Sequence, residues 1–165
     1  MQLPDATQRI AQLLKDAGHP HAPVMLDDAA RTAQQAADAL KVQLGQIAKS
    51  IIFRRKPDDV TVLVITSGDR RVDEQKVQAL VCTEGQKLSR ADADYVKAQT
   101  GFAIGGVSPI GHLNPPVCLI DQELARFDTI WAAAGHPYAV FQLSWTQLQA
   151  LTHAPVGDVT QSPAK

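Results

Sequence analysis

A lysine interrupts an apolar run of the sequence and is the first candidate for chemistry. Lys49 follows Ile47-Ala48 and comes shortly before Ile51-Ile52-Phe53, at the start of a strand that we expect to be central in its sheet. Most lysines in this situation extend the side chain until the ammonium group reaches solvent. The alternative is an ammonium group at the mouth of a pocket, where it binds an acyl carbonyl or a phosphate.

The second candidate is a segment rich in glycine and proline, residues 100–116, which shows neither helical nor strand periodicity. Its centre is Gly105-Gly106-Val107-Ser108-Pro109. Adjacent glycines allow the backbone to approach a ligand closely and to point N–H groups at it, and the proline stiffens the exit. Such a loop suits a ribose, a phosphate or a developing oxyanion, whereas a plain surface loop is the simpler interpretation.

Familiar catalytic and metal-binding patterns are missing from the sequence. It contains no GxSxG, HExxH, P-loop or GxGxxG motif. Its five histidines are scattered over predicted turns, where surface roles are typical. Cys82 and Cys118 are far apart and have no CxxC partner, so we expect reduced thiols in a reducing compartment. We therefore expect neither a metal ion nor a cofactor.

The overall charge limits the nucleic-acid contacts that the chain can make. The net charge is −1 and the sequence pI is about 6.5, which argues against a broad cationic surface for DNA. Contact with only the end of a nucleic acid is compatible with this charge. Acidic residues follow both Arg54-Arg55-Lys56 and Arg70-Arg71, so we interpret these groups as solvated loop ends, with a nucleic-acid contact as the second interpretation.

Length and composition predict one soluble domain. The chain has 165 residues, 45% of them hydrophobic and 20% charged, which is enough for a core of its own. No window approaches about 18 uninterrupted apolar residues, and the N-terminal segment carries charges throughout, so we expect neither a membrane span nor a signal peptide. We place the domain at residues 1–160, a frayed tail at 161–165, and the protein in the cytoplasm.

Helix starts are predicted by capping signals, and strands by β-branched runs. Capping boxes begin helices at Asp5 with Gln8, Thr32 with Gln35 and Ser144 with Gln147; Asp92 caps a helix that Gly101 ends; and a helix over residues 73–81 turns Val77, Leu80 and Val81 inward. Residues 50–55 and 60–66 form a hairpin, and further strands are expected at 24–26, 117–120, 129–133 and 138–143. Helices and strands mix without regular alternation, which predicts an α+β fold with a mixed, largely antiparallel sheet.

Three segments carry a resemblance to a known family: TAQQAA at residues 32–37, QIAKSIIF at 46–53 and TGFAIGGVSPIGH at 100–112. Together they resemble the YbaK/EbsC family, whose members are free-standing relatives of the editing domain inserted in bacterial prolyl-tRNA synthetase. The lysine before an apolar strand, combined with the downstream G-x-x-x-P loop, is the specific part of the pattern. The resemblance runs from about Ala6 to Val159.

The resemblance implies a barrel-like sheet surrounded by helices, and hydrolysis of mischarged aminoacyl-tRNA in trans. Lys49 matches the family's essential lysine, and the loop Gly105-Gly106-Val107-Ser108-Pro109 matches its substrate loop. Ser50 and His136 fall where family members vary the residues around the acyl pocket. The implied partners are the acceptor end of a mischarged tRNA and, transiently, an aminoacyl-tRNA synthetase, with no membrane and no DNA.

The chemistry of such a reaction is consistent with the missing motifs. An aminoacyl ester of ribose is already activated, and the neighbouring ribose hydroxyl assists the departure of the leaving oxygen. The reaction then needs orientation, a positioned water and a cation or N–H groups at the developing oxyanion. A small pocket admits small amino acids that a synthetase has attached in error. Two alternatives stay open: a non-catalytic module that binds nucleotides or tRNA ends, and an inert paralogue whose loop is only structural.

Overall fold

The chain folds around a long β-hairpin. In the computed structural model, which describes residues 3–27 and 32–161, strand β2 (Ile47–Lys56) pairs antiparallel with β3 (Val60–Ser67). Four consecutive β3 residues, Val62 to Ile65, are fully buried. Because neighbouring residues of a strand point to opposite faces, this run shows that both faces of β3 are covered. The predicted hairpin is confirmed.

Six further strands among the described residues extend the hairpin into one mixed sheet with the order β1-β7-β6-β2-β3-β5-β8, and β4 also pairs with β2. They are β1 (Val24–Met25), β4 (Lys87–Arg90), β5 (Val117–Asp121), β6 (Ile130–Ala133), β7 (Ala139–Leu143) and β8 (Val156–Gly157). Pairing is parallel in β2–β6, β3–β5 and β5–β8 and antiparallel in the other four pairs. The α+β class and the mixed, largely antiparallel sheet are confirmed.

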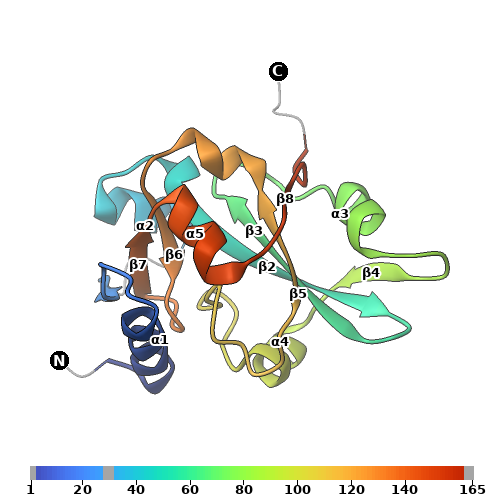
Figure 1. Cartoon of the computed structure of the whole chain (residues 1–165), viewed down its shortest axis with the longest axis horizontal. Coiled ribbons are helices and arrows are strands. Elements are labelled where there is room, and N and C mark those ends of the chain that lie inside the picture. The colour runs from blue at the N-terminus through green and yellow to red at the C-terminus, as the bar shows by residue number, and fades with distance from the viewer. Residues whose placement is uncertain (1–2, 28–31, 162–165) are drawn as a thin grey trace.

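In the described part of the chain, five helices surround the sheet: α1 (Asp5–Asp16), α2 (Ala33–Leu40), α3 (Glu74–Val81), α4 (Ala93–Thr100) and α5 (Trp145–Thr152). Two short 3-10 helices, η1 (Leu44–Gln46) and η2 (Gln122–Arg126), connect strands. Helices α1 and α2 lie with β7 toward one end of the hairpin, and α3 lies with β4 toward the other (Figure 1). Within the described ranges, no helix is both long and apolar enough to cross a membrane.

Most helix starts follow the local capping signals. Thr32 and Ser144 each form the predicted capping box. The capping box predicted at Asp5 is wrong, because Pro4 occupies the N-cap position and the Gln8 side chain bonds a preceding backbone carbonyl instead. Proline fixes φ near the value of a helix start, so α1 begins directly after Pro4, one residue earlier than the capping signal indicates.

Helix α3 buries a narrower face than predicted. Val77 is fully buried and Val81 is half-buried, but the prediction for Leu80 is wrong, since 56% of this residue is exposed. A helix of two turns contacts the sheet through one row of side chains, and Val77 and Val81, four residues apart, form that row. Strand β4 follows α3 and was not predicted, because KLSR contains no β-branched residue; its backbone pairing with β2 forms it.

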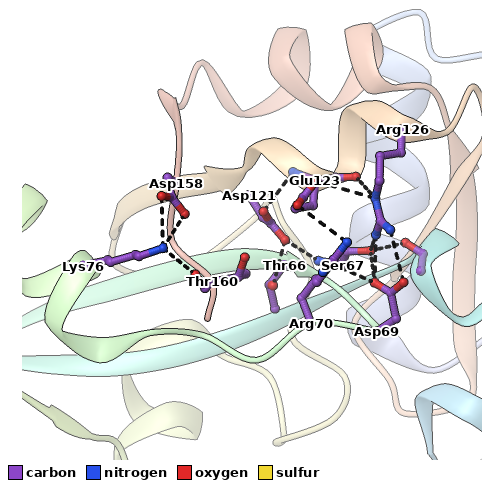
Figure 2. Close-up of polar contacts among 11 residues, drawn as sticks. Thr66, Ser67, Asp69, Arg70, Lys76, Asp121, Glu123, Arg126, Asp158 and Thr160 are labelled. Carbon is purple, nitrogen blue, oxygen red and sulfur yellow. Dashed lines mark hydrogen bonds and ion pairs between the residues drawn. The ribbon is translucent and has the colours of Figure 1, made fainter. Parts of the chain in front are cut away.

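The last described residues are held against the segment that follows β3. The Gln161 N–H donates to the Arg71 carbonyl oxygen at 2.8 Å. The Lys76 ammonium donates to the Thr160 carbonyl oxygen, also at 2.8 Å (Figure 2). Residues 162–165, the rest of the predicted frayed tail, lie outside the described residues.

A gap in the pairing of β2 shapes the functional half of the fold. One edge of β2 pairs with β3 along almost its whole length. The other edge pairs with β6 at Ile47 and Ala48 and with β4 from Phe53 onward, and the Ala91 N–H donates to the Ile52 carbonyl oxygen at 3.3 Å. Among the described residues, no strand pairs with this edge at positions 49–51. The gap leaves room for a pocket in the middle of a sheet.

A buried carboxylate ties β3 to β5 beside this gap. Asp121, the last residue of β5, is fully buried, and its Oδ2 accepts hydrogen bonds from Thr66 Oγ1 at 3.1 Å and from the Ser67 N–H at 3.0 Å. Its Oδ1 accepts from the Glu123 N–H at 2.9 Å (Figure 2). A buried charge is tolerated only where such partners replace water. Asp121 therefore fixes the ends of two strands and the start of η2.

Replacing Asp121 by asparagine should lower the free energy of unfolding by about 2–3 kcal/mol, because an amide NH₂ then faces a backbone donor in a buried site. The measurement is urea denaturation of Asp121→Asn. Asp158→Asn is the matched control, since Asp158 also loses a charge but is 57% exposed and pairs only with Lys76 at the surface. Equal losses in the two variants would contradict the structural role of Asp121.

Candidate active site

A pocket of about 290 Å³ occupies the gap in the sheet. Three β2 residues, Lys49, Ser50 and Ile51, line it on the edge that no strand covers. Helix α2, strand β6 and the glycine loop close the remaining sides, through Ala33, Ala133 and Gly105 respectively. The pocket therefore forms where several separate segments of the chain meet, and the lysine predicted from the sequence lies in its wall.

Lys49 lies in a row of side chains that crosses three strands. Its cross-strand neighbour on β3 is Thr66, which in turn donates a hydrogen bond to Asp121 of β5. The row lies on one face of the sheet, because directly paired residues share a face. Figure 2 shows Thr66 and Asp121 side by side at the ends of their strands. Lys49 is thus placed next to a fixed polar group in an otherwise apolar part of the sheet.

Burial lowers the pKa of Lys49 from its ordinary value, and the nearby positive charges of Arg71 and Arg90 lower it further. Asp69 and Asp121 act in the opposite direction and raise this pKa. The ammonium group is half-buried, and no carboxylate lies within ion-pair distance of it among the described residues. A cation without a close anionic partner is available to an oxygen of a ligand.

Ser50, the next residue of β2, also has polar groups at this gap. Successive residues of a strand point to opposite faces, so the side chains of Lys49 and Ser50 approach the pocket from opposite faces of the sheet. Ser50 Oγ is buried and has no hydrogen-bond partner among the described residues. The Ile52 carbonyl points to the open edge, so by strand alternation the N–H and C=O of Ser50 point there as well.

The two glycines of the loop are required for different structural reasons. Gly105 has φ +91°, a conformation that other residues rarely adopt, and it lines the pocket. A Cβ on Gly106 would lie 2.8 Å from the backbone of His136, so only glycine allows this approach. Val107 is buried and lines the pocket after the glycines. The loop is therefore pressed against the turn between β6 and β7.

The remaining predicted site residues lie behind the pocket wall. Ser108 is fully buried and its Oγ accepts from the Ile110 N–H at 3.2 Å, while Pro109 lines a separate surface pocket. His136 does not line the main pocket, and its Nδ1 accepts from the Tyr138 N–H at 3.2 Å. The structure thus brings Lys49, Ser50, Gly105 and Val107 to the pocket. The other four predicted residues, Gly106, Ser108, Pro109 and His136, do not line it.

Several lining residues were not singled out by sequence reasoning. They share an apolar or small side chain and come from α2, β6, β7 and the loop: Ala33, Ala36, Ile104, Trp131, Ala133 and Val140. Thr32, the N-cap of α2, is the polar exception. The sequence signal for Ala33 and Ala36 was indirect: both lie in the segment TAQQAA, which carries part of the family resemblance.

The comparison with known proteins agrees with this architecture. Residues 27–151 match a family model described as the aminoacyl-tRNA editing domain. The uncharacterized protein YwhH of Bacillus subtilis (strain 168) is 34% identical over 125 residues, which are 76% of this chain and 77% of YwhH. The proline–tRNA ligase of Kosmotoga olearia is 37% identical over 90 residues, which are 54% of this chain and 15% of the ligase.

A solved structure extends the likeness to the whole fold. The crystal structure of a candidate trans-editing enzyme for prolyl tRNA synthetase superposes with a TM-score of 0.90 and 36% identity, covering 98% of this chain and 100% of that chain. The family model covers most of the chain, and the matched range includes Lys49 and the glycine loop. The chain therefore belongs to the YbaK-like family of aminoacyl-tRNA editing domains, as its motifs predicted.

Proposed function

We propose that this protein hydrolyses, in trans, the ester bond of a mischarged tRNA that carries a small amino acid. The observation that carries the proposal is the half-buried ammonium group of Lys49 in the wall of an apolar pocket, in a chain of the editing-domain family. The pocket volume of about 290 Å³ lies at the lower end of ligand sites, so it holds an aminoacyl group but no nucleotide in addition.

The geometry supports a role for Lys49 at the carbonyl oxygen. When water adds to the ester carbonyl, negative charge develops on that oxygen, and a preorganised cation stabilises it. The Ser50 carbonyl, which points into the gap, suits the α-ammonium group of the amino acid, which all substrates share. The carbon–oxygen bond to the ribose then breaks, and the proton released by the water passes to the ribose oxygen. The products are the free amino acid and the uncharged tRNA.

The lining does not supply a conventional general base. Among the described residues that line the pocket, none is a histidine, a cysteine or a carboxylate. An activated ester with a neighbouring ribose hydroxyl reduces the need for one, because orientation and oxyanion stabilisation provide most of the rate enhancement. The proposed role of Lys49 is therefore electrostatic, and the water is deprotonated with the help of the substrate.

The proposal also sets expectations for partners and location. The substrate is the acceptor end of an aminoacyl-tRNA, and the similarity to the proline–tRNA ligase favours a transient association with a synthetase that charges the tRNA. These substrates are made in the cytoplasm, which is where the protein would act. The test of the whole proposal is release of amino acid from a panel of Ala-, Cys-, Ser-, Thr- and Pro-charged tRNAs by the purified protein.

The first prediction from this proposal concerns Lys49→Met, which should lower the deacylation rate at least about 100-fold, the effect of removing one preorganised oxyanion partner. The same variant should be no less stable than the wild type. A buried lysine with a lowered pKa binds fewer protons when folded, so wild-type stability rises with pH between the lowered pKa and about 10.4, and below that window the full cost of burying the charge is present.

Two measurements check this prediction. Single-turnover deacylation gives the rate, and urea denaturation at several pH values gives the stability difference, which should shrink as the pH rises toward the ordinary lysine pKa. Lys56→Met is the control, because Lys56 lies at the exposed end of the same strand and outside the pocket. Unchanged turnover in Lys49→Met would remove Lys49 from the mechanism.

A second prediction concerns the size limit of the pocket. Ala33→Leu adds three carbon atoms at the α2 wall, so release of the larger amino acids on the panel should fall by about tenfold or more, while release of alanine should fall least. Ala39→Leu, on the exposed side of the same helix, is the matched control. A uniform loss for all amino acids would show that α2 does not form the selective wall.

A further inference from the structure

A second and smaller pocket continues the first along the open edge of β2. Its volume is about 110 Å³, and it shares Ser50, Ile104 and Gly105 with the main pocket. On the side away from α2 it is lined by Arg90, the last residue of β4, and by Ala91. The two pockets therefore form one continuous groove that follows the gap from β6 to β4.

Arg90 is positioned at the end of this groove by its neighbours. It is the cross-strand partner of Phe53, and its guanidinium carbon lies 5.4 Å from the centre of the Phe53 ring. Phe53 is fully buried, whereas Arg90 is exposed. Contact between a guanidinium group and an aromatic ring restrains the side chain without consuming its hydrogen-bond donors. Arg90 thus presents a positioned cation to whatever occupies the groove.

The charge pairing distinguishes Arg90 from the arginines of the hairpin end. Arg54 pairs with Asp59, and Arg55 pairs with Asp58 at 2.7 Å, so these cations are already neutralised. No carboxylate lies within ion-pair distance of Arg90 in the described part of the chain. Its charge nevertheless reaches Lys49, since Arg90 lowers the pKa of that group. Two unpaired cations therefore face the same groove from its two ends.

The covalent structure of an aminoacyl-tRNA end fits this arrangement. The aminoacyl group is joined through its ester to the ribose of the last nucleotide, so a ribose must lie at the mouth of the main pocket. Ile104, which is 56% exposed, borders both pockets and offers an apolar surface at that point. The next charged group along the chain is the 5′ phosphate of the same nucleotide, and arginine recognises phosphate oxygens with paired N–H donors.

We infer that the smaller pocket is a subsite for the 5′ phosphate end of the last nucleotide of the tRNA, with Arg90 bound to that phosphate. This inference rests on the proposed function, because it takes the aminoacyl group to lie beside Lys49. A subsite of this kind concentrates recognition on one nucleotide. Binding would then depend only weakly on salt. For one phosphate of a single strand, the logarithm of the binding constant falls by about 0.7 for each unit of the logarithm of the salt concentration.

The test uses stable analogues in which an amide replaces the ester: 3′-alanylamino-3′-deoxyadenosine, with and without a 5′ phosphate. Calorimetric titration of the wild-type protein should show that the phosphate tightens binding about tenfold, the usual effect of a charge-assisted hydrogen bond. In Arg90→Ala this preference should disappear. Lys87→Ala is the matched control, since Lys87 is an exposed cation of the same strand outside the pocket, and it should keep the preference.

The outcomes separate this inference from the proposed function. Arg90→Lys keeps the charge but not the paired donors, and it should restore part of the phosphate preference. On charged tRNA, Arg90→Ala should raise KM. A wild-type protein that binds both analogues equally, or binds neither, overturns the subsite. A phosphate preference that depends on Arg90 in a protein that releases no amino acid supports the subsite and overturns the deacylase.

Discussion

The interrupted pairing of β2 is the constraint on which the rest of the site depends. A strand in the middle of a sheet normally satisfies its backbone on both edges, and here β6 and β4 each cover only one end of the same edge. Backbone N–H and C=O groups that are not paired inside a protein are costly unless a ligand or water satisfies them. The fold therefore exposes polar backbone groups inside an apolar setting, where a ligand can pair with them.

The neighbouring charges show how the fold supports a cation at this position. A buried ammonium group at Lys49 would by itself be unfavourable in an apolar pocket. The carboxylates of Asp69 and of Asp121, the latter two strands away, partly offset this cost without forming an ion pair with Lys49. A direct pair would neutralise the ammonium group and remove its use to a substrate. The distance between Lys49 and Asp121, bridged by Thr66, is thus a compromise between stability and chemistry.

Local patterns in the sequence predicted the hairpin and the capping boxes at Thr32 and Ser144. Together with the family resemblance, they also predicted four of the residues that line the pocket, Lys49, Ser50, Gly105 and Val107. They could not predict β4, whose four residues have no strand preference and depend on the backbone of β2. Nor could they show the gap, since it results from where β6 and β4 end on β2. The position of His136 behind the wall depends on the same long-range pairing.

The contact between Gly106 and the backbone of His136 has a consequence for how such domains diverge. It holds the loop that contains Gly105 against the β6–β7 turn, so this side of the pocket tolerates little change. Helix α2 lines the pocket with small side chains, at Ala33 and Ala36. Larger side chains at these two positions would narrow the cavity without touching that contact. One scaffold can therefore form pockets of different size through substitutions on a single helix.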